Sequence, residues 1–125
     1  FEDIFGSEQL IFQPQANVLV NITNNAWFGK SIASSQHFQM SRMRAIESGK
    51  FLLRASNTGV TAIIRPDGSI QNKLALFDYS LLKDSFHPMK GSTPYIKFGN
   101  YLIIILIIFM MTLGYYLGLN LRKKS

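Results

Sequence analysis

The fold is decided by residues 17–70, which read NVLVNITNNAWFGKSIASSQHFQMSRMRAIESGKFLLRASNTGVTAIIRPDGSI. The first seven residues, Asn17 to Thr23, form a β-branched run that leads into two more asparagines, as a buried strand entering a loop does. A loop through residues 26–30 follows and carries two adjacent large aromatic side chains. The stretch therefore opens with a predicted strand whose carboxyl end presents an aromatic loop.

A helix is predicted after this loop. Ser34 or Ser35 can cap a helix from Gln36 to Ser48, because a side-chain hydroxyl accepts a hydrogen bond from a free amide of the first turn. Gly49 stands just past the end of this segment, where glycine tolerates the left-handed conformation that ends many helices. The apolar residues of the segment do not keep to one stripe, which predicts contacts on more than one side.

Strands are predicted after the helix. Phe51 to Ala55 and Val60 to Arg65 have strand composition, and Pro66-Asp67-Gly68 is a turn signal, since proline presets φ and glycine accepts a positive φ. Ser69 to Leu76 would return antiparallel, and Leu81 to Phe86 is predicted as another strand. The order strand, helix, strand and hairpin indicates an α/β fold.

An uncharged apolar run lies near the end of the chain. Residues 101–119 read YLIIILIIFMMTLGYYLGL and would extend roughly 28 Å as a helix, close to the thickness of a bilayer's hydrocarbon core. The alternative is a buried core helix. A helix that is apolar on every face would need to be covered all round, and the rest of this small domain is not large enough to do so. Arg122, Lys123 and Lys124 directly follow the run, so the positive-inside tendency predicts that this end is cytoplasmic.

Composition excludes several function classes. The 13 Lys and Arg residues outnumber the 7 Asp and Glu residues, but outside the tail the basic residues are spread singly, so nucleic-acid binding is not expected. The sequence contains no cysteine, which rules out a disulfide or a cysteine nucleophile within these residues. His37 and His87 are far apart in sequence, and no metal site is predicted.

Two features of residues 21–48 are candidates for chemistry. Trp27 and Phe28 follow a strand end, where large aromatics either line a binding pocket or fill the core, and composition does not separate the two. Glu47 lies three residues after Arg44 on the predicted helix, which favours a structural ion pair over a catalytic acid.

Several motifs resemble those of bacterial apolipoprotein N-acyltransferases. They are AWFG at 26–29, QHFQMSRMRAIE at 36–47, SNTG at 56–59 and GSTPY at 91–95, followed by the terminal apolar helix. They occur in the order and at spacings compatible with that family. The resemblance covers nearly the whole chain.

The resemblance implies an α/β fold, a partial nitrilase-like αββα sandwich followed by one transmembrane helix. Residues 1–90 would be the C-terminal part of a nitrilase-like (carbon-nitrogen hydrolase) domain and residues 91–100 a linker. Residues 101–119 would form the transmembrane helix and residues 120–125 a basic cytoplasmic tail. The chain is therefore expected to be the C-terminal piece of a longer protein.

The resemblance also implies where the active site lies. The family's nucleophilic cysteine is expected just before Phe1, so no catalytic residue falls within the chain, and the family's glutamate and lysine would lie further upstream. Phe1 and Glu2 are expected to support the site, with phenylalanine standing where the family usually has tyrosine. Asn24, Trp27 and Phe28 are expected to bind substrate. No cofactor and no metal are implied.

The implied reaction joins two lipid substrates. A phospholipid would donate an acyl chain through a cysteine thioester, and the amine of a diacylglyceryl lipoprotein would accept it. The protein would lie in the bacterial inner membrane, in contact with membrane lipids, with its globular part periplasmic. Two alternatives stay open, namely a membrane-tethered nitrilase-type amidase and a non-catalytic anchor domain.

Overall fold

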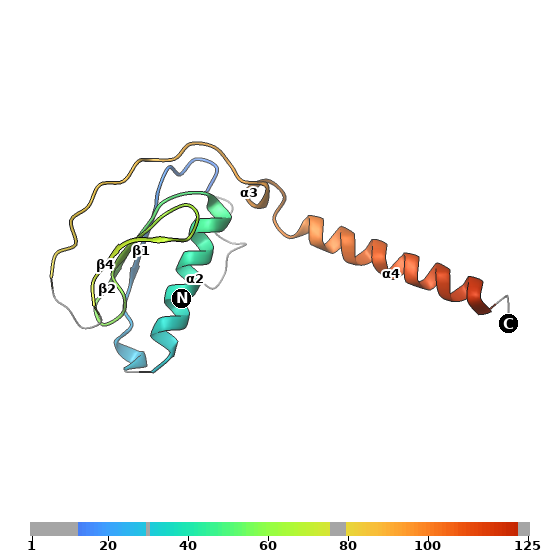
Figure 1. Cartoon of the computed structure of the whole chain (residues 1–125), viewed down its shortest axis with the longest axis horizontal. Helices are drawn as coiled ribbons and strands as arrows, with labels where there is room; N and C mark the ends of the chain where they lie inside the picture. Colours follow the sequence, from blue (N-terminus) through green and yellow to red (C-terminus); the bar gives the residue numbers. More distant parts are fainter. Residues whose placement is uncertain (1–12, 30, 76–79, 123–125) are drawn as a thin grey trace.

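The computed structural model describes residues 13–29, 31–75 and 80–122. Within them, a four-stranded sheet of order β1-β2-β3-β4 carries helix α2 on one face, and a long helix, α4, projects away from this unit (Figure 1). The elements are β1 (Leu19–Thr23), η2 (Ala26–Phe28), α2 (Ala33–Ser48), β2 (Leu52–Ser56), β3 (Ala62–Ile64), β4 (Ile70–Lys73), α3 (Pro94–Phe98) and α4 (Tyr101–Arg122). The predicted α/β class is confirmed.

The register of the sheet places the ends of two strands side by side. Strand β1 pairs in parallel with β2, from Leu19 opposite Leu52 to Thr23 opposite Ser56, and α2 is the crossover between them. Strands β2, β3 and β4 then pair antiparallel. Because β1 and β2 are parallel, both of their carboxyl ends face the same edge of the sheet.

The core lies between α2 and the sheet. Its buried apolar side chains come from the helix and from the two central strands, and they are Phe38, Ala45, Leu52, Ala62 and Ile64. Burying each large aliphatic or aromatic side chain contributes about 1.5–3 kcal/mol relative to leaving it in water. Met43 and Ile46 are about half exposed, but Ile46 lies close to Gly68 in the turn between β3 and β4. Arg42 Nε donates to the Gly68 carbonyl at 2.8 Å, so α2 contacts this turn as well as the sheet.

Two helix-end predictions have different outcomes. Helix α2 begins at Ala33, its N-cap position is Ile32, and no side chain caps it, so the prediction of a Ser34 or Ser35 cap was wrong. Both serines lie inside the first turn, and the Ser34 hydroxyl instead accepts a hydrogen bond from another loop. Gly49 ends the helix with a φ of 63°, in the left-handed region, as predicted.

The predicted strand from Leu81 to Phe86 was wrong. Residues 80–90 form neither helix nor strand, and run around the outside of the sheet as an irregular segment (Figure 1). The hydrogen bonds of this segment to the rest of the fold are single ones and do not form a strand ladder. The Gln71 side chain donates to the Ser85 carbonyl at 2.7 Å, and the Met89 amide donates to the Asn17 carbonyl at 2.9 Å.

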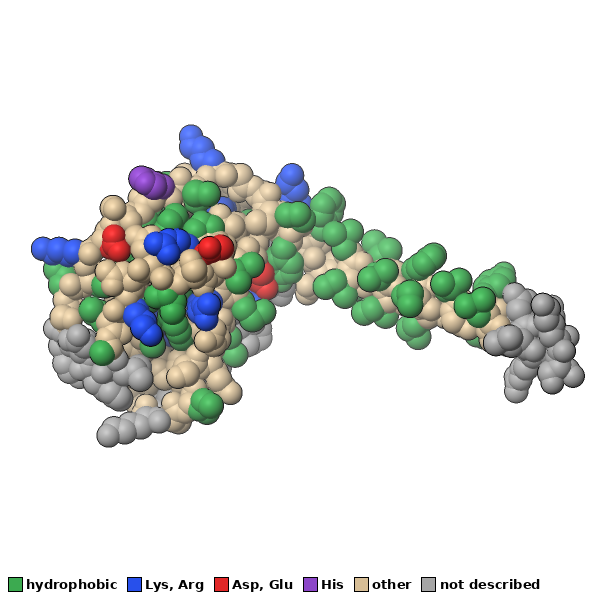
Figure 2. Space-filling view, viewed as in Figure 1, with side chains coloured by type: hydrophobic (Ala, Val, Ile, Leu, Met, Phe, Trp, Pro, Cys, Tyr) green, Lys and Arg blue, Asp and Glu red, His purple; other side chains and the backbone are tan. Residues whose placement is uncertain are grey.

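The segment before α4 is partly helical. Residues 91–100, the predicted linker, contain α3, which starts with a proline at its first position and with Thr93 as N-cap. Helix α4 is long and apolar enough to cross a membrane over Tyr101–Gly118, and none of that window is buried. Hydrophobic side chains stand out along this helix in Figure 2.

Candidate functional site

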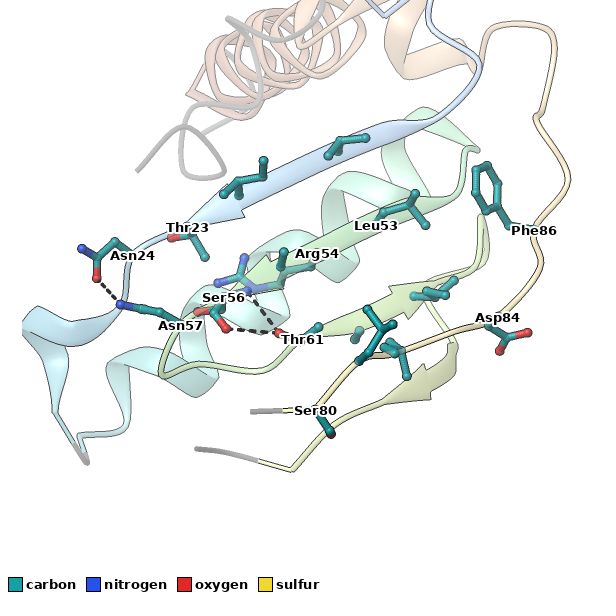
Figure 3. A pocket seen from close by; sticks show the side chains of 17 residues that line it. Thr23, Asn24, Leu53, Arg54, Ser56, Asn57, Thr61, Ser80, Asp84 and Phe86 are labelled. Carbon is teal, nitrogen blue, oxygen red and sulfur yellow. Dashed lines mark hydrogen bonds between the residues drawn. The ribbon is translucent and has the colours of Figure 1, made fainter. Parts of the chain in front are cut away.

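Two hydrogen-bonded asparagines lie at the carboxyl ends of β1 and β2. Asn24 follows β1, Asn57 follows β2, and the Asn57 Nδ2 donates to the Asn24 Oδ1 at 2.8 Å (Figure 3). The same Asn24 oxygen accepts the Ala26 amide at 3.0 Å, which sets the turn into η2. The side chain of Asn24, a predicted substrate-binding residue, thus shapes the loop and joins it to the second strand.

Asn25 ties three elements together. It is only 1% exposed, and its backbone amide donates to the Asn57 Oδ1 at 3.0 Å. Its Nδ2 donates to the Ser34 Oγ at 3.3 Å, and its Oδ1 accepts the Thr23 hydroxyl at 3.2 Å. Buried polar groups are costly unless they are hydrogen-bonded, so this network fixes the loop after β1 against β2 and the start of α2. Sequence reasoning did not single out this residue.

Gly59 allows this close packing. A Cβ at this position would overlap Asn25 Nδ2 and would lie 2.7 Å from Ser56 Oγ. The glycine amide donates to that same serine oxygen at 3.0 Å, and the Ser56 amide donates to the Thr61 hydroxyl at 3.1 Å. The last residue of the SNTG motif is therefore glycine because the neighbouring amide and hydroxyl occupy the space of a side chain.

Trp27 points away from the core. It lies in η2, which Gly29 ends with a φ of 52°, and it is 87% exposed. The core alternative for this ring does not hold in the described structure. The side chain of Phe28 and the whole of Phe1 and Glu2 lie outside the described residues.

A cavity of about 900 Å³ lies on the sheet face opposite α2. Residues 80–86 form its outer wall, and Asn24 and Asn57 lie at one end of it (Figure 3). The apolar part of its lining consists of Val20, Ile22, Leu53, Ala55, Ala62, Ile63, Leu81, Leu82 and Phe86. Asn24 lines this cavity, whereas Trp27 lies on the exposed loop after β1 and does not line it.

Arg54 is a buried charged residue that sequence reasoning missed. It is 2% exposed, and its Nη1 donates to the Asn21 Oδ1 at 3.1 Å and to the Ser41 Oγ. The sequence signal was available, since an arginine interrupts the apolar run FLLRA. A charge in the middle of a predicted strand indicates a buried polar cluster, because an uncompensated charge is costly there.

Three more ionisable groups, an ion pair and a lysine, lie near the C-terminal end of α2. Arg44 Nη1 and Glu47 Oε2 are 2.7 Å apart, which confirms the predicted ion pair. Burial raises the pKa of Glu47, while the charge of Arg44 acts in the opposite direction. Lys50 is buried, its Nζ donates to the Gln13 carbonyl, and burial lowers the pKa of this lysine. In the described part of the chain no group of three or more His, Cys, Asp or Glu could hold a metal ion.

Comparison with known proteins decides the family. The family model of the carbon-nitrogen hydrolases matches residues 2–82, well over half of the chain. The chain belongs to the carbon-nitrogen hydrolase family. Its parallel β1–β2 pair with α2 as the crossover is the part of that nitrilase-like fold that carries the asparagine network.

The relatives of this carbon-nitrogen hydrolase are named apolipoprotein N-acyltransferase, which confirms the resemblance seen in the motifs. The protein from Nitrosomonas europaea is 44% identical over 125 residues, all of this chain and 25% of the relative. That from Ralstonia nicotianae is 49% identical over 104 residues, 80% of this chain and 20% of the relative. That from Methylococcus capsulatus is 48% identical over 101 residues, 81% of this chain and 20% of the relative. The chain spans a quarter or less of the length of these relatives.

Proposed function

We propose that this chain is part of an apolipoprotein N-acyltransferase that transfers a phospholipid acyl chain to a diacylglyceryl lipoprotein. The observation that carries the proposal is the extent of the similarity. The Nitrosomonas relative matches all 125 residues, so the match includes the apolar helix α4 as well as the hydrolase-like part. The membrane-tethered amidase is the less favoured alternative, because the relatives reported above are all named apolipoprotein N-acyltransferase.

The proposed reaction proceeds in two acyl transfers. A cysteine thiolate attacks the ester carbonyl of the phospholipid, the bond to the glycerol oxygen breaks, and a lysophospholipid leaves with a proton. The enzyme then holds the acyl chain as a thioester. The α-amine of the diacylglyceryl cysteine attacks this thioester, a C–N bond forms and the C–S bond breaks. The family's glutamate, acting as general base, would accept the proton that the amine loses and pass it to the departing cysteine sulfur.

This chain would supply the walls of the site rather than its nucleophile. With the cysteine expected just before Phe1, the Phe1 backbone N–H would help to stabilise the oxyanion of each tetrahedral intermediate, and Glu2 would support the site. Asn24, Trp27 and Phe28 would contact the acyl chains and headgroups. The 87% exposure of Trp27 supports this role, because an indole free of the core is available to an apolar substrate.

The membrane position follows from helix α4. We propose that α4 crosses the bacterial inner membrane, with Arg122 and the lysines after it in the cytoplasm and the globular part in the periplasm. Both substrates are lipid-anchored, so a site next to the bilayer surface is accessible to them by lateral diffusion. No nucleic acid, cofactor or metal takes part in the proposed reaction.

The test uses the full-length parent, meaning the longer protein of which this chain is expected to be the C-terminal piece. It follows transfer of the acyl group by mass spectrometry. Incubation with phospholipid alone should add one acyl chain to the protein, and subsequent addition of a diacylglyceryl peptide should yield the triacylated peptide. Replacing the cysteine expected before Phe1 by alanine should abolish both products. The present chain alone, which contains no cysteine, should form neither. Hydrolysis of small amides without lipid transfer would favour the amidase, and inactivity of the parent would favour the anchor domain.

A further inference from the structure

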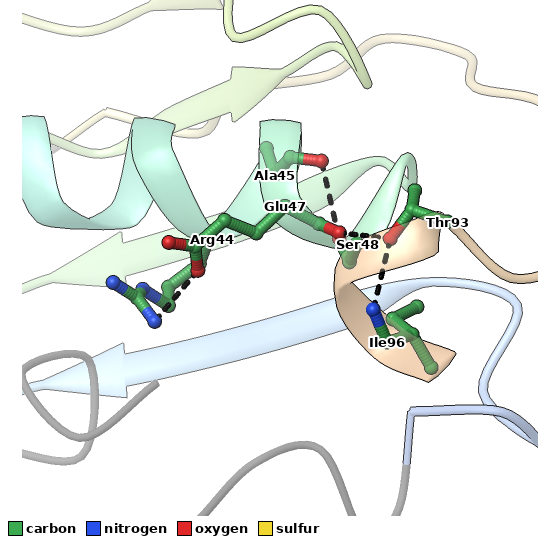
Figure 4. A network of polar contacts seen from close by, with 6 residues as sticks. All are labelled: Arg44, Ala45, Glu47, Ser48, Thr93 and Ile96. Carbon is green, nitrogen blue, oxygen red and sulfur yellow. Dashed lines mark hydrogen bonds and ion pairs between the residues drawn. The ribbon is translucent and has the colours of Figure 1, made fainter. Parts of the chain in front are cut away.

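One hydroxyl group joins the globular part to the segment that leads into the membrane helix. The Thr93 Oγ1 donates to the Glu47 carbonyl in the last turn of α2, and it accepts the Ile96 amide of α3 at 3.2 Å (Figure 4). Helix ends leave backbone carbonyls and amides without intrahelical partners. The threonine therefore caps the C-terminal end of one helix and the N-terminal end of the next.

The junction is closely packed. Gly49, the residue that ends α2, approaches so near that a Cβ there would lie 2.9 Å from Thr93 Cγ2. Ile96 of α3 is buried. The Thr93 hydrogen bond and the contact of its methyl group with Gly49 thus hold the start of α3 against the end of α2.

Helix α3 in turn sets the start of α4. Only Gly99 and Asn100 separate the two helices. The Gly99 amide donates to the Tyr95 carbonyl at 2.7 Å, and the Ile104 amide donates to the Asn100 carbonyl at 3.1 Å, so both connecting residues are hydrogen-bonded to helix backbone. Each connecting residue therefore closes the end of its own helix, and with only these two residues in between, the direction in which α4 leaves depends on where α3 ends.

Helix α2 connects this junction to the loop that carries Trp27. In Figure 1 α2 runs steeply across the direction of α4, with η2 near one end and α3 near the other. The 16 residues of α2 give it a length of roughly 24 Å. A small rotation at the junction is thus amplified into a displacement of the loop relative to the bilayer.

We propose that Thr93 is a positioning residue, which holds α2 at a fixed angle to the membrane helix so that the Trp27 loop stays at the bilayer surface. The inference rests on the proposed function. Loss of the Thr93 hydroxyl lowers access of bilayer-borne lipid to the site and leaves acylation by a soluble ester intact, because the reacting groups themselves are untouched.

The test compares Thr93→Val with Thr93→Ser in the full-length parent. Valine keeps the branched shape and removes the hydroxyl, whereas serine keeps the hydroxyl. Acyl transfer is measured with phosphatidylethanolamine in vesicles, and thioester formation is measured separately with p-nitrophenyl butyrate in solution. Thr93→Val removes both hydrogen bonds of the hydroxyl and should lower kcat/KM for the vesicle donor at least about fivefold, the loss expected from one of them alone, chiefly through a higher KM. Its rate with the soluble ester should match that of the parent, and Thr93→Ser should match the parent in both.

A structural readout accompanies the kinetics. Nitroxide labels at Ser35, exposed in the first turn of α2, and at exposed Asn100, directly before α4, report the distance between the start of α2 and the start of α4. The nucleophilic cysteine of the parent is replaced by alanine for this measurement. Thr93→Val should broaden the distance distribution, whereas Thr93→Ser should not. Unchanged distances and vesicle kinetics in Thr93→Val would overturn the positioning role while leaving the N-acyltransferase function standing, and so would an equal loss with the soluble ester.

Discussion

Replacing Trp27 by alanine in the full-length parent separates a substrate contact from a core contact. The residue is 87% exposed, so 13% of its surface is covered. A fully buried tryptophan removes about 150–250 Å² from water, so the covered part corresponds to about 20–33 Å² and about 0.5–0.8 kcal/mol. Truncating a buried tryptophan would instead cost about 3–5 kcal/mol. The variant should therefore express and fold like the parent and lose acyl transfer.

The assay combines two measurements on the same purified protein. Thermal unfolding in detergent reports stability, and the mass of the triacylated peptide reports activity. Leu52→Ala is the matched control, because Leu52 is 2% exposed in the core and its truncation should cost about 2–5 kcal/mol. Trp27→Phe, which keeps an aromatic ring, should retain more transfer than Trp27→Ala. A Trp27→Ala variant that loses as much stability as Leu52→Ala, with activity falling in proportion to the folded fraction, would refute the reasoning.

Three further predictions concern the network, the membrane and pH. Gly59→Ala should destabilise the parent by about 1–3 kcal/mol, because its Cβ overlaps the Asn25 amide group; an unchanged thermal midpoint would contradict the packing described here. A reporter fused after Ser125 that works only in the periplasm should stay silent, and strong activity would reverse the proposed orientation. Burial raises the pKa of Glu47 above 4.5 despite the charge of Arg44, so the folded state keeps this proton to higher pH than the unfolded chain. Stability should therefore fall as the pH rises from 4.5 through the folded pKa. Glu47→Gln should flatten that slope in thermal unfolding as the pH rises above 4.5, and an equal slope in both proteins would contradict the assignment.

Local signals predicted most of the regular structure. The β-branched run before Asn24 became β1, Gly49 ended α2, and Pro66-Asp67-Gly68 became the turn between β3 and β4, with a φ of 78° at its glycine. Each of these depends on the conformational range of a few adjacent residues, which the sequence specifies directly. The prediction for segment 81–86 rested on its apolar residues, but the segment is irregular, and its apolar side chains line the cavity on the face of the sheet.

The long apolar helix and the family also followed from the sequence. An uncharged run of this length needs no tertiary information to be recognised, because the bilayer thickness sets the requirement. The motifs AWFG, RAIE and SNTG were enough to indicate the relatives, and the comparisons confirmed them.

Tertiary structure alone decided how the site is held. The buried amide of Asn25, the guanidinium of Arg54 and the hydroxyl of Thr93 each bond to residues far along the chain, at Asn57, Asn21 and Glu47. A hydrogen bond depends on distances of a few ångströms and on direction, and both are fixed only when the strands and helices have packed. The residue types were visible in the sequence, whereas their partners were set by the parallel pairing of β1 with β2 and by the contact of α2 with α3.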